Sequence, residues 1–88
     1  MVNHKKVYTT FFNLDRTDHI LCTNCGQLAV DIHHIHPRGM GGSSKDYIEN
    51  LVALCRSCHD KAESSPYFNK QVKVKHLQKV LYKLESEI

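Results

Sequence analysis

Alternation of apolar and polar side chains marks the middle of the chain. Over residues 27–35, Leu28, Val30 and Ile32 occupy every second position. A period of two is typical of a half-buried β-strand, and Pro37 closes the segment. A short apolar run at residues 51–54 predicts a second strand. The glycine-rich residues between these two segments predict a connecting loop.

The N-terminal segment favours a short helix. Val7, Phe11 and Leu14 recur at close to helical spacing, and the polar residues around Asp15 are suited to end such a helix. The same segment is rich in aromatic and β-branched residues. A strand over residues 7–12 is therefore the alternative.

Two further helices are predicted after the second strand. The first covers residues 57–63 and has Cys58 and His59 at its start. Ser65 and Pro66 then suit the N-cap and the first turn of a longer helix that continues to the end of the chain. Two strands followed by a short helix, with a helix on either flank, predict a small α+β fold.

An apolar stripe runs along the last predicted helix. Its members are spaced by three and four residues: Val74, Leu77, Leu81, Leu84 and Ile88. Because the stripe spans only about two heptads, we expect it to cover the core of its own domain. A monomer is therefore expected, and a homodimer formed through this stripe is the alternative.

Four cysteines form two C-x2-C pairs, and this spacing predicts a tetrahedral zinc site with four thiolate ligands. The predicted ligands are Cys22, Cys25, Cys55 and Cys58. A chain of 88 residues buries too little apolar surface to be comfortably stable by itself, so a structural metal would compensate. Two disulfides, which suit a secreted protein, are one alternative, and a redox C-x2-C pair is another.

The N-terminus lacks the apolar segment of a signal peptide, and no later run is long enough to span a bilayer. These features predict a cytoplasmic protein with no membrane partner. The formal net charge is +3, and the excess of basic residues lies after residue 65, where five lysines outnumber two glutamates. This basic segment either contacts nucleic-acid phosphates or is a solvated helix face.

The central motif resembles a known family. The run VDIHHIHPRGMGG followed by ENLVALCRSCH closely resembles the HNH endonucleases of the ββα-metal (His-Me finger) type, whose pattern is named after His34, Asn50 and His59. The resemblance covers about residues 22–63. It implies a ββα-metal core stapled by the four-cysteine zinc site, with flanking helices. Residues 1–65 would be the nuclease domain with its N-terminal helix, and residues 66–88 a basic amphipathic helix packed on it.

The resemblance also implies catalytic roles. His34 would be the general base, His33 and His59 would hold a catalytic divalent ion, and Asn50 would fix the loop so that His34 faces the attacking water. Many relatives carry Asp at the position of His33, so Mg²⁺, Mn²⁺, Ni²⁺ and Zn²⁺ all stay open as the ion.

Two alternatives concern the ligands of this ion. Strict alternation along a strand would pair Asp31 with His33 as ligands and turn His34 to the other face. Glu63 follows His59 by four residues, which places both on one face of a helix. It is either an extra ligand or an exposed side chain.

These features predict a metal-dependent endonuclease that nicks or cuts DNA with little sequence preference of its own. By resemblance, a bacterial or phage-infected cell is its setting. The alternative is a catalytically silent, zinc-dependent nucleic-acid-binding module or a subunit of a larger DNA-processing complex. The candidate DNA contacts are Arg38, Lys73, Lys75, Lys79 and Lys83.

Overall fold

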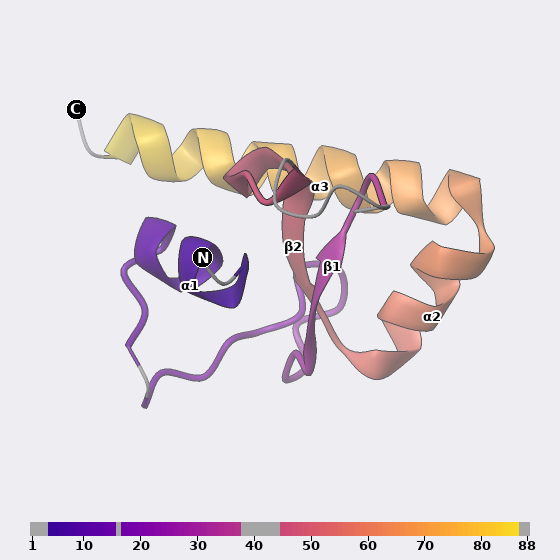
Figure 1. Cartoon of the computed structure of the whole chain (residues 1–88), viewed down its shortest axis with the longest axis horizontal. Helices are drawn as coiled ribbons and strands as arrows, with labels where there is room; N and C mark the ends of the chain where they lie inside the picture. Colours follow the sequence, from indigo (N-terminus) through magenta and orange to yellow (C-terminus); the bar gives the residue numbers. More distant parts are fainter. Residues whose placement is uncertain (1–3, 16, 38–44, 87–88) are drawn as a thin grey trace.

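The computed structural model describes residues 4–15, 17–37 and 45–86. Arg38 and the predicted loop at residues 38–44 lie outside this part, as does Ile88. In chain order the elements are α1 His4–Phe11, β1 Asp31–His34, the short 3₁₀ helix η2 Ile48–Asn50, β2 Leu51–Leu54, α2 Arg56–Ser64 and α3 Pro66–Ser86 (Figure 1). The predicted small α+β fold, a ββα unit with a helix on each flank, is confirmed.

The two strands form an antiparallel sheet in which His33 pairs with Val52 and His34 with Leu51. β1 is shorter than the strand predicted over residues 27–35. The backbone before Val30 is bonded to the preceding turn instead, through a bridge between Leu21 and Leu28. The turn itself needs Gly26, whose φ of 83° is rarely adopted by other residues.

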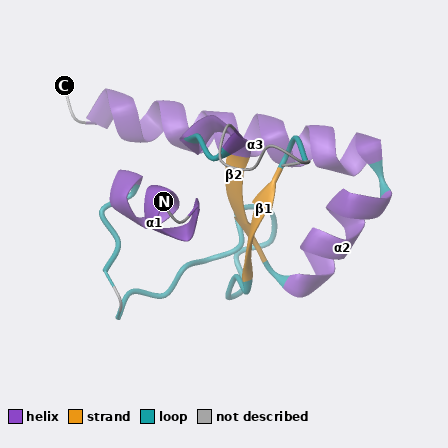
Figure 2. Ribbon diagram, in the orientation of Figure 1, coloured by secondary structure: helices purple, strands orange, loops and turns teal. Residues whose placement is uncertain are grey.

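β2 is buried on both faces because helices flank the two strands (Figure 2). Leu51 and Ala53 pack with Tyr8 of α1 in one core cluster. Val52 and Leu54 belong to a second cluster, which includes Val72 of α3 and residues of α2. All four side chains of β2 are fully buried, which explains why its sequence is continuously apolar rather than alternating.

The N-terminal segment is a helix, and the alternative of a strand is wrong. Tyr8 is fully buried, and its hydroxyl oxygen accepts a hydrogen bond from Nζ of Lys79 at 3.1 Å. Nζ of Lys79 also lies 4.8 Å from the ring centre of Phe12, a cation–π arrangement. Lys79 therefore fastens α1 to α3.

α3 begins as predicted, because Oγ of Ser65 accepts a hydrogen bond from the backbone N–H of Phe68 at 3.2 Å and so acts as its N-cap. Its buried side chains are Val72, His76 and Val80. The division of the chain at residues 65 and 66 stays a prediction. None of the described helices has the length and apolar character needed to cross a bilayer.

The apolar stripe of α3 does not cover the core, so that expectation is wrong. Val74 is 52% exposed and Leu81 is 56% exposed. The reason is that a different row of side chains faces the sheet and η2. Nε2 of His76, in this buried row, lies 2.6 Å from the carbonyl oxygen of Ile48 and fixes the rotation of the helix.

Candidate active site and metal centre

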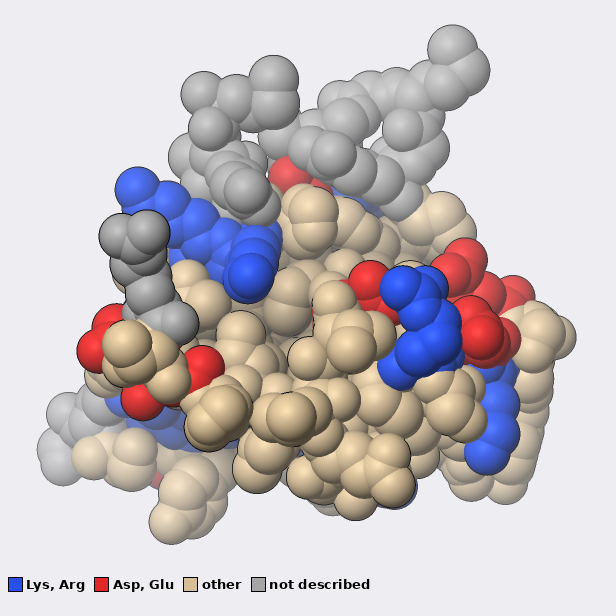
Figure 3. Space-filling view, turned by 90° about the horizontal axis from the view of Figure 1, so that it is seen from below, with Lys and Arg blue, Asp and Glu red and all other residues tan. Residues whose placement is uncertain are grey.

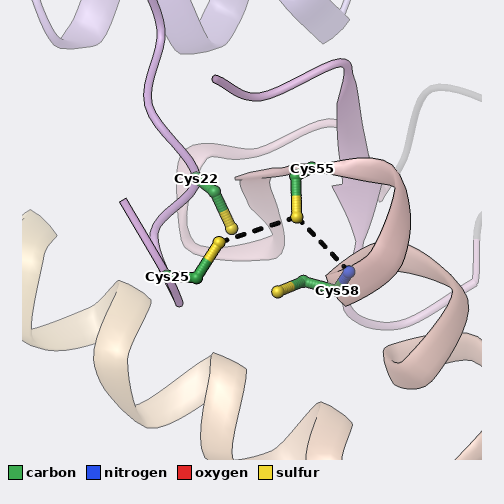
Figure 4. Close-up of side chains that lie close together, drawn as sticks. All are labelled: Cys22, Cys25, Cys55 and Cys58. Carbon is green, nitrogen blue, oxygen red and sulfur yellow. Dashed lines mark hydrogen bonds between the residues drawn. The ribbon is translucent and has the colours of Figure 1, made fainter. Parts of the chain in front are cut away.

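The four cysteines converge in space, two from the turn before β1 and two from the junction of β2 and α2 (Figure 4). Their sulfur atoms all lie within 4.8 Å of one another. The sulfur atoms of Cys25 and Cys55 are 3.7 Å apart. A tetrahedral zinc ion with Zn–S bonds of about 2.3 Å separates its ligands by about 3.8 Å, so the cluster fits such an ion.

Local hydrogen bonds hold the two C-x2-C turns in place. The sulfur of Cys55 caps α2 by accepting from the backbone N–H of Cys58 at 3.5 Å. Nδ2 of Asn24 donates to the sulfur of Cys58 at 3.4 Å, and Nζ of Lys75 donates to Oδ1 of Asn24 at 2.7 Å. The backbone N–H of Thr23 bonds the carbonyl of Ala53, which ties the first turn to β2.

The surroundings of the cluster shift the pKa values of two thiols in opposite directions. Burial alone raises the pKa of Cys22, but backbone N–H groups, first among them that of Cys55, lower it to about 6. Burial and the neighbouring thiols raise the pKa of Cys58 to about 12. All four cysteines are free, and no pair forms a disulfide. Four sulfur donors in one space suit a soft divalent cation that offsets the repulsion between thiolates.

Side chains alternate along β1 through its last residue. Ile32 packs in the cluster on the α1 side, and His34 follows it on that face. Asp31 and His33 face α2 and α3. The strand therefore places the two adjacent histidines on opposite faces.

His33 is held by Asn69 of α3. Nε2 of His33 lies 2.8 Å from Oδ1 of Asn69, and Nδ2 of Asn69 donates to the carbonyl of Ile35 at 2.9 Å. Because a carbonyl oxygen only accepts, the amide orientation is fixed, and Nε2 of His33 must carry the proton. Burial lowers the pKa of His33, which favours the neutral ring. The lone pair of its Nδ1 is thereby available.

His59 lies in the first half of α2 with a carboxylate at each ring nitrogen. Nδ1 lies 2.8 Å from Oδ2 of Asp31, and Nε2 lies 2.8 Å from Oε1 of Glu63, one turn further along the helix. Asp31 also contacts Nη1 of Arg56 at 3.3 Å. The ring centres of His33 and His59 are 5.0 Å apart. These residues offer nitrogen and oxygen donor atoms near one another, although no three of their ligand atoms all lie within 4.8 Å of one another.

His34 has different neighbours. Its Nε2 lies 2.7 Å from Oδ1 of Asp46, whose side chain is only 4% exposed. The rings of His34 and His4 are 5.0 Å apart, centre to centre. His4, His34 and Asp46 offer ligand atoms within 4.8 Å of one another, and among the described residues only the four cysteines form another such group.

Asn50 joins the two ends of the loop between the strands. It is 1% exposed. Its Oδ1 accepts from the backbone N–H of His36 at 2.7 Å, and its Nδ2 donates to the carbonyls of His36 and Lys45, each at 3.0 Å. The side chain thus fixes the backbone two residues after His34.

A depression of about 500 Å³ collects most of these groups, and its lining includes His33, His34, His59, Glu63 and Asn69. β1 pairs with β2 along one edge only, so side chains from both of its faces can border the same space. The structure therefore brings both adjacent histidines to one surface despite their alternation.

The predicted basic contacts are dispersed. Nζ of Lys73 lies 3.4 Å from Nε2 of His36, close to the central motif. Lys75 and Lys79 bind Asn24 and Tyr8, at the cysteine cluster and at α1. Lys83 lies near the end of α3. On the face seen in Figure 3, basic and acidic side chains form small neighbouring groups rather than one extended patch.

Three polar partners were not predicted from the sequence: Asn24, Asp46 and Asn69. Each contacts a predicted ligand or catalytic side chain through a hydrogen bond across the fold. The spacing of the motifs gives no signal for them, because 36 residues separate His33 from Asn69 and 34 separate Asn24 from Cys58.

The family comparison agrees with this geometry. A family model of HNH endonucleases matches residues 22–65, which is half of the 88-residue chain. The chain therefore belongs to the HNH endonuclease family, which assigns it a nuclease-type function acting on nucleic acid. No curated protein and no solved structure matched the chain.

Proposed function

We propose that the chain is a metal-dependent endonuclease that hydrolyses DNA phosphodiester bonds, with His34 as its general base. The observation that carries the proposal is the contact of His34 with Asp46. An ionised carboxylate only accepts, so Nε2 of His34 carries the proton and Nδ1 keeps its lone pair. A neutral imidazole oriented by a buried carboxylate is suited to take a proton from water near neutral pH.

The residues that would hold the catalytic divalent ion are His33, His59 and Glu63. Asp31 accepts from Nδ1 of His59, which leaves Nε2, next to Glu63, as the ring atom for the ion. In this arrangement Asp31 orients the His59 ring and is not itself a ligand of the ion. When bound, the ion supplies Lewis-acid stabilisation of charge on the phosphate and the departing oxygen.

The group formed by His4, His34 and Asp46 is an alternative place for the ion. In that arrangement His34 would be a ligand and could not serve as the base. The family pattern favours the first arrangement, because the matched residues 22–65 contain His33, His59 and Glu63 but not His4. His4 therefore serves as the comparison residue in the tests below.

DNA is the proposed substrate, bound in the depression that the histidines line. Lys73 contacts His36, whose neighbours in sequence, Ile35 and Pro37, line the depression, so its ammonium group could meet a phosphate there. Lys75, Lys79, Lys83 and Arg38 stay weaker candidates, because Lys75 contacts Asn24 at the cysteine cluster, Lys79 contacts Tyr8 of α1, and Arg38 lies outside the described residues. Structural zinc in the four-cysteine cluster would hold α2, and hence His59, in register with β1.

Cleavage of supercoiled plasmid tests this proposal. The protein is incubated with DNA and with Mg²⁺, Mn²⁺, Ni²⁺ or Zn²⁺ in turn. We expect nicked or linear product with at least one ion, and a loss of roughly 10²–10⁴-fold in rate for His34→Ala. His19→Ala is the control, because His19 is exposed and does not line the depression. DNA binding without cleavage under every ion would instead support the silent binding module.

A further inference from the structure

A row of exposed apolar side chains runs along α3. Val74, Leu77, Leu81 and Leu84 are 52%, 38%, 56% and 48% exposed. The core is covered by another row of the same helix, which contains Val72, His76 and Val80. In Figure 1 the sheet, α1 and α2 all lie below α3. Within the part of the chain that the structure describes, the stripe is therefore an apolar face of a long helix that no other element covers.

The spacing of the stripe fits a helix with the same spacing. Steps of three and four residues form the seam of a coiled coil, in which each side chain inserts between side chains of a similar stripe. Antiparallel pairing of two copies places Val74 opposite Leu84 and Leu77 opposite Leu81. The stripe is thus complementary to itself.

The charges at the two ends of the stripe favour antiparallel pairing of two α3 helices. Lys70 precedes Val74 by four residues, and Glu85 follows Leu81 by four, so both lie along the stripe at its two ends. Antiparallel pairing brings the Lys70 end of one helix beside the Glu85 end of the other. Parallel pairing would place like charges together, which is unfavourable.

We propose that this stripe binds a second copy of the chain, forming an antiparallel homodimer through α3. The interface concerns association only, goes beyond the nuclease function and does not depend on it. The proposed dimer replaces the monomer expected from the sequence, because that expectation assumed that the stripe was buried in its own domain.

Sedimentation equilibrium over about 1 µM to 1 mM measures the association. We expect a concentration-dependent dimer, whose dissociation constant rises by at least about 100-fold in Leu81→Glu, because the substitution occurs twice in each dimer. Tyr82→Glu is the matched control: it adds the same charge at the next position, which is 78% exposed and off the stripe, and should leave the constant unchanged. A wild-type chain that stays monomeric throughout overturns the proposal.

A charge exchange tests the antiparallel direction and does not rely on removing an apolar side chain. Lys70→Glu alone and Glu85→Lys alone each place like charges together and should weaken the dimer several-fold. The double variant restores opposite charges and should return toward wild-type affinity. A double variant weaker than both single variants would contradict antiparallel pairing.

Discussion

Nε2 of His34 lies 2.7 Å from Oδ1 of Asp46, and the two residues lie at opposite ends of the loop that joins β1 to β2. Asp46→Asn should lower the cleavage rate by about 10–100-fold, because an amide can donate as well as accept and no longer selects the ring tautomer. Single-turnover kinetics measures the change. If Asp46 acts through His34, adding Asp46→Asn to His34→Ala should cause little further loss. A full additional loss of rate in the double variant would show that Asp46 acts independently of His34.

The zinc prediction concerns the four-cysteine cluster. The purified chain should hold one zinc per monomer, measured by native mass spectrometry. A structural zinc site contributes roughly 10–16 kcal/mol of apparent folding free energy, so chelation under reducing conditions should abolish cooperative unfolding. Cys58→Ser should lose zinc and fold poorly. A zinc-free protein containing two disulfides would contradict this prediction.

The catalytic ion can be followed separately from zinc. In the zinc-loaded protein, His59→Ala should lower the affinity for the added divalent ion, and Glu63→Ala should lower it less, because Glu63 is more exposed. Titration calorimetry measures both affinities. His4→Ala should leave them unchanged. The reverse result, a loss with His4→Ala and none with His59→Ala, would move the ion to the group formed by His4, His34 and Asp46.

Salt dependence distinguishes the lysines. Lys73→Gln should reduce the log–log slope of DNA affinity against salt by about 0.9, the value for one lost phosphate contact on duplex DNA. Lys79→Gln should leave that slope nearly unchanged and lower thermal stability instead, since its side chain fastens α1 to α3. Equal slopes in the wild type and in Lys73→Gln would remove Lys73 from the interface.

His76 predicts a pH dependence of stability. Burial lowers its pKa below the ordinary value of 6.5, and the nearby Lys79 acts in the same direction. The unfolded chain therefore binds this proton more readily, so the free energy of unfolding should fall as pH decreases below about 6.5. His76→Gln keeps a donor for the Ile48 carbonyl but does not titrate. Denaturant titrations should show a flatter pH curve for this variant, and parallel curves would exclude His76 as a cause.

The cysteine spacing predicted the metal cluster, because two C-x2-C pairs determine a site with little help from the rest of the fold. The apolar run at residues 51–54 likewise predicted β2, since a strand buried on both faces needs no alternation. These local patterns have one dominant physical cause each. The metal cluster and β2 could therefore be predicted without information on tertiary contacts.

The face of α3 that packs on the core could not be predicted in this way. The helix carries two rows at helical spacing, and the buried row contains His76 between Val72 and Val80. A polar residue at its centre weakens the hydrophobic signal of this row relative to the leucine stripe. Which row faces inward is shown by tertiary contacts, among them the contact of His76 with the Ile48 carbonyl, from a segment 28 residues earlier.

The hydrogen bond between Lys79 and Tyr8 spans 71 residues of sequence. Both core clusters depend on β2, yet one is completed by α1 near the start of the chain and the other by Val72 of α3. A chain emerging from the ribosome therefore contains every member of the first cluster once Ala53 is made, but it cannot complete the second cluster before Val72 is added. We infer that the α1 side of the core can pack first and that the side next to the cysteines closes only with α3, so a chain shortened before Val72 should keep only one of its two core clusters.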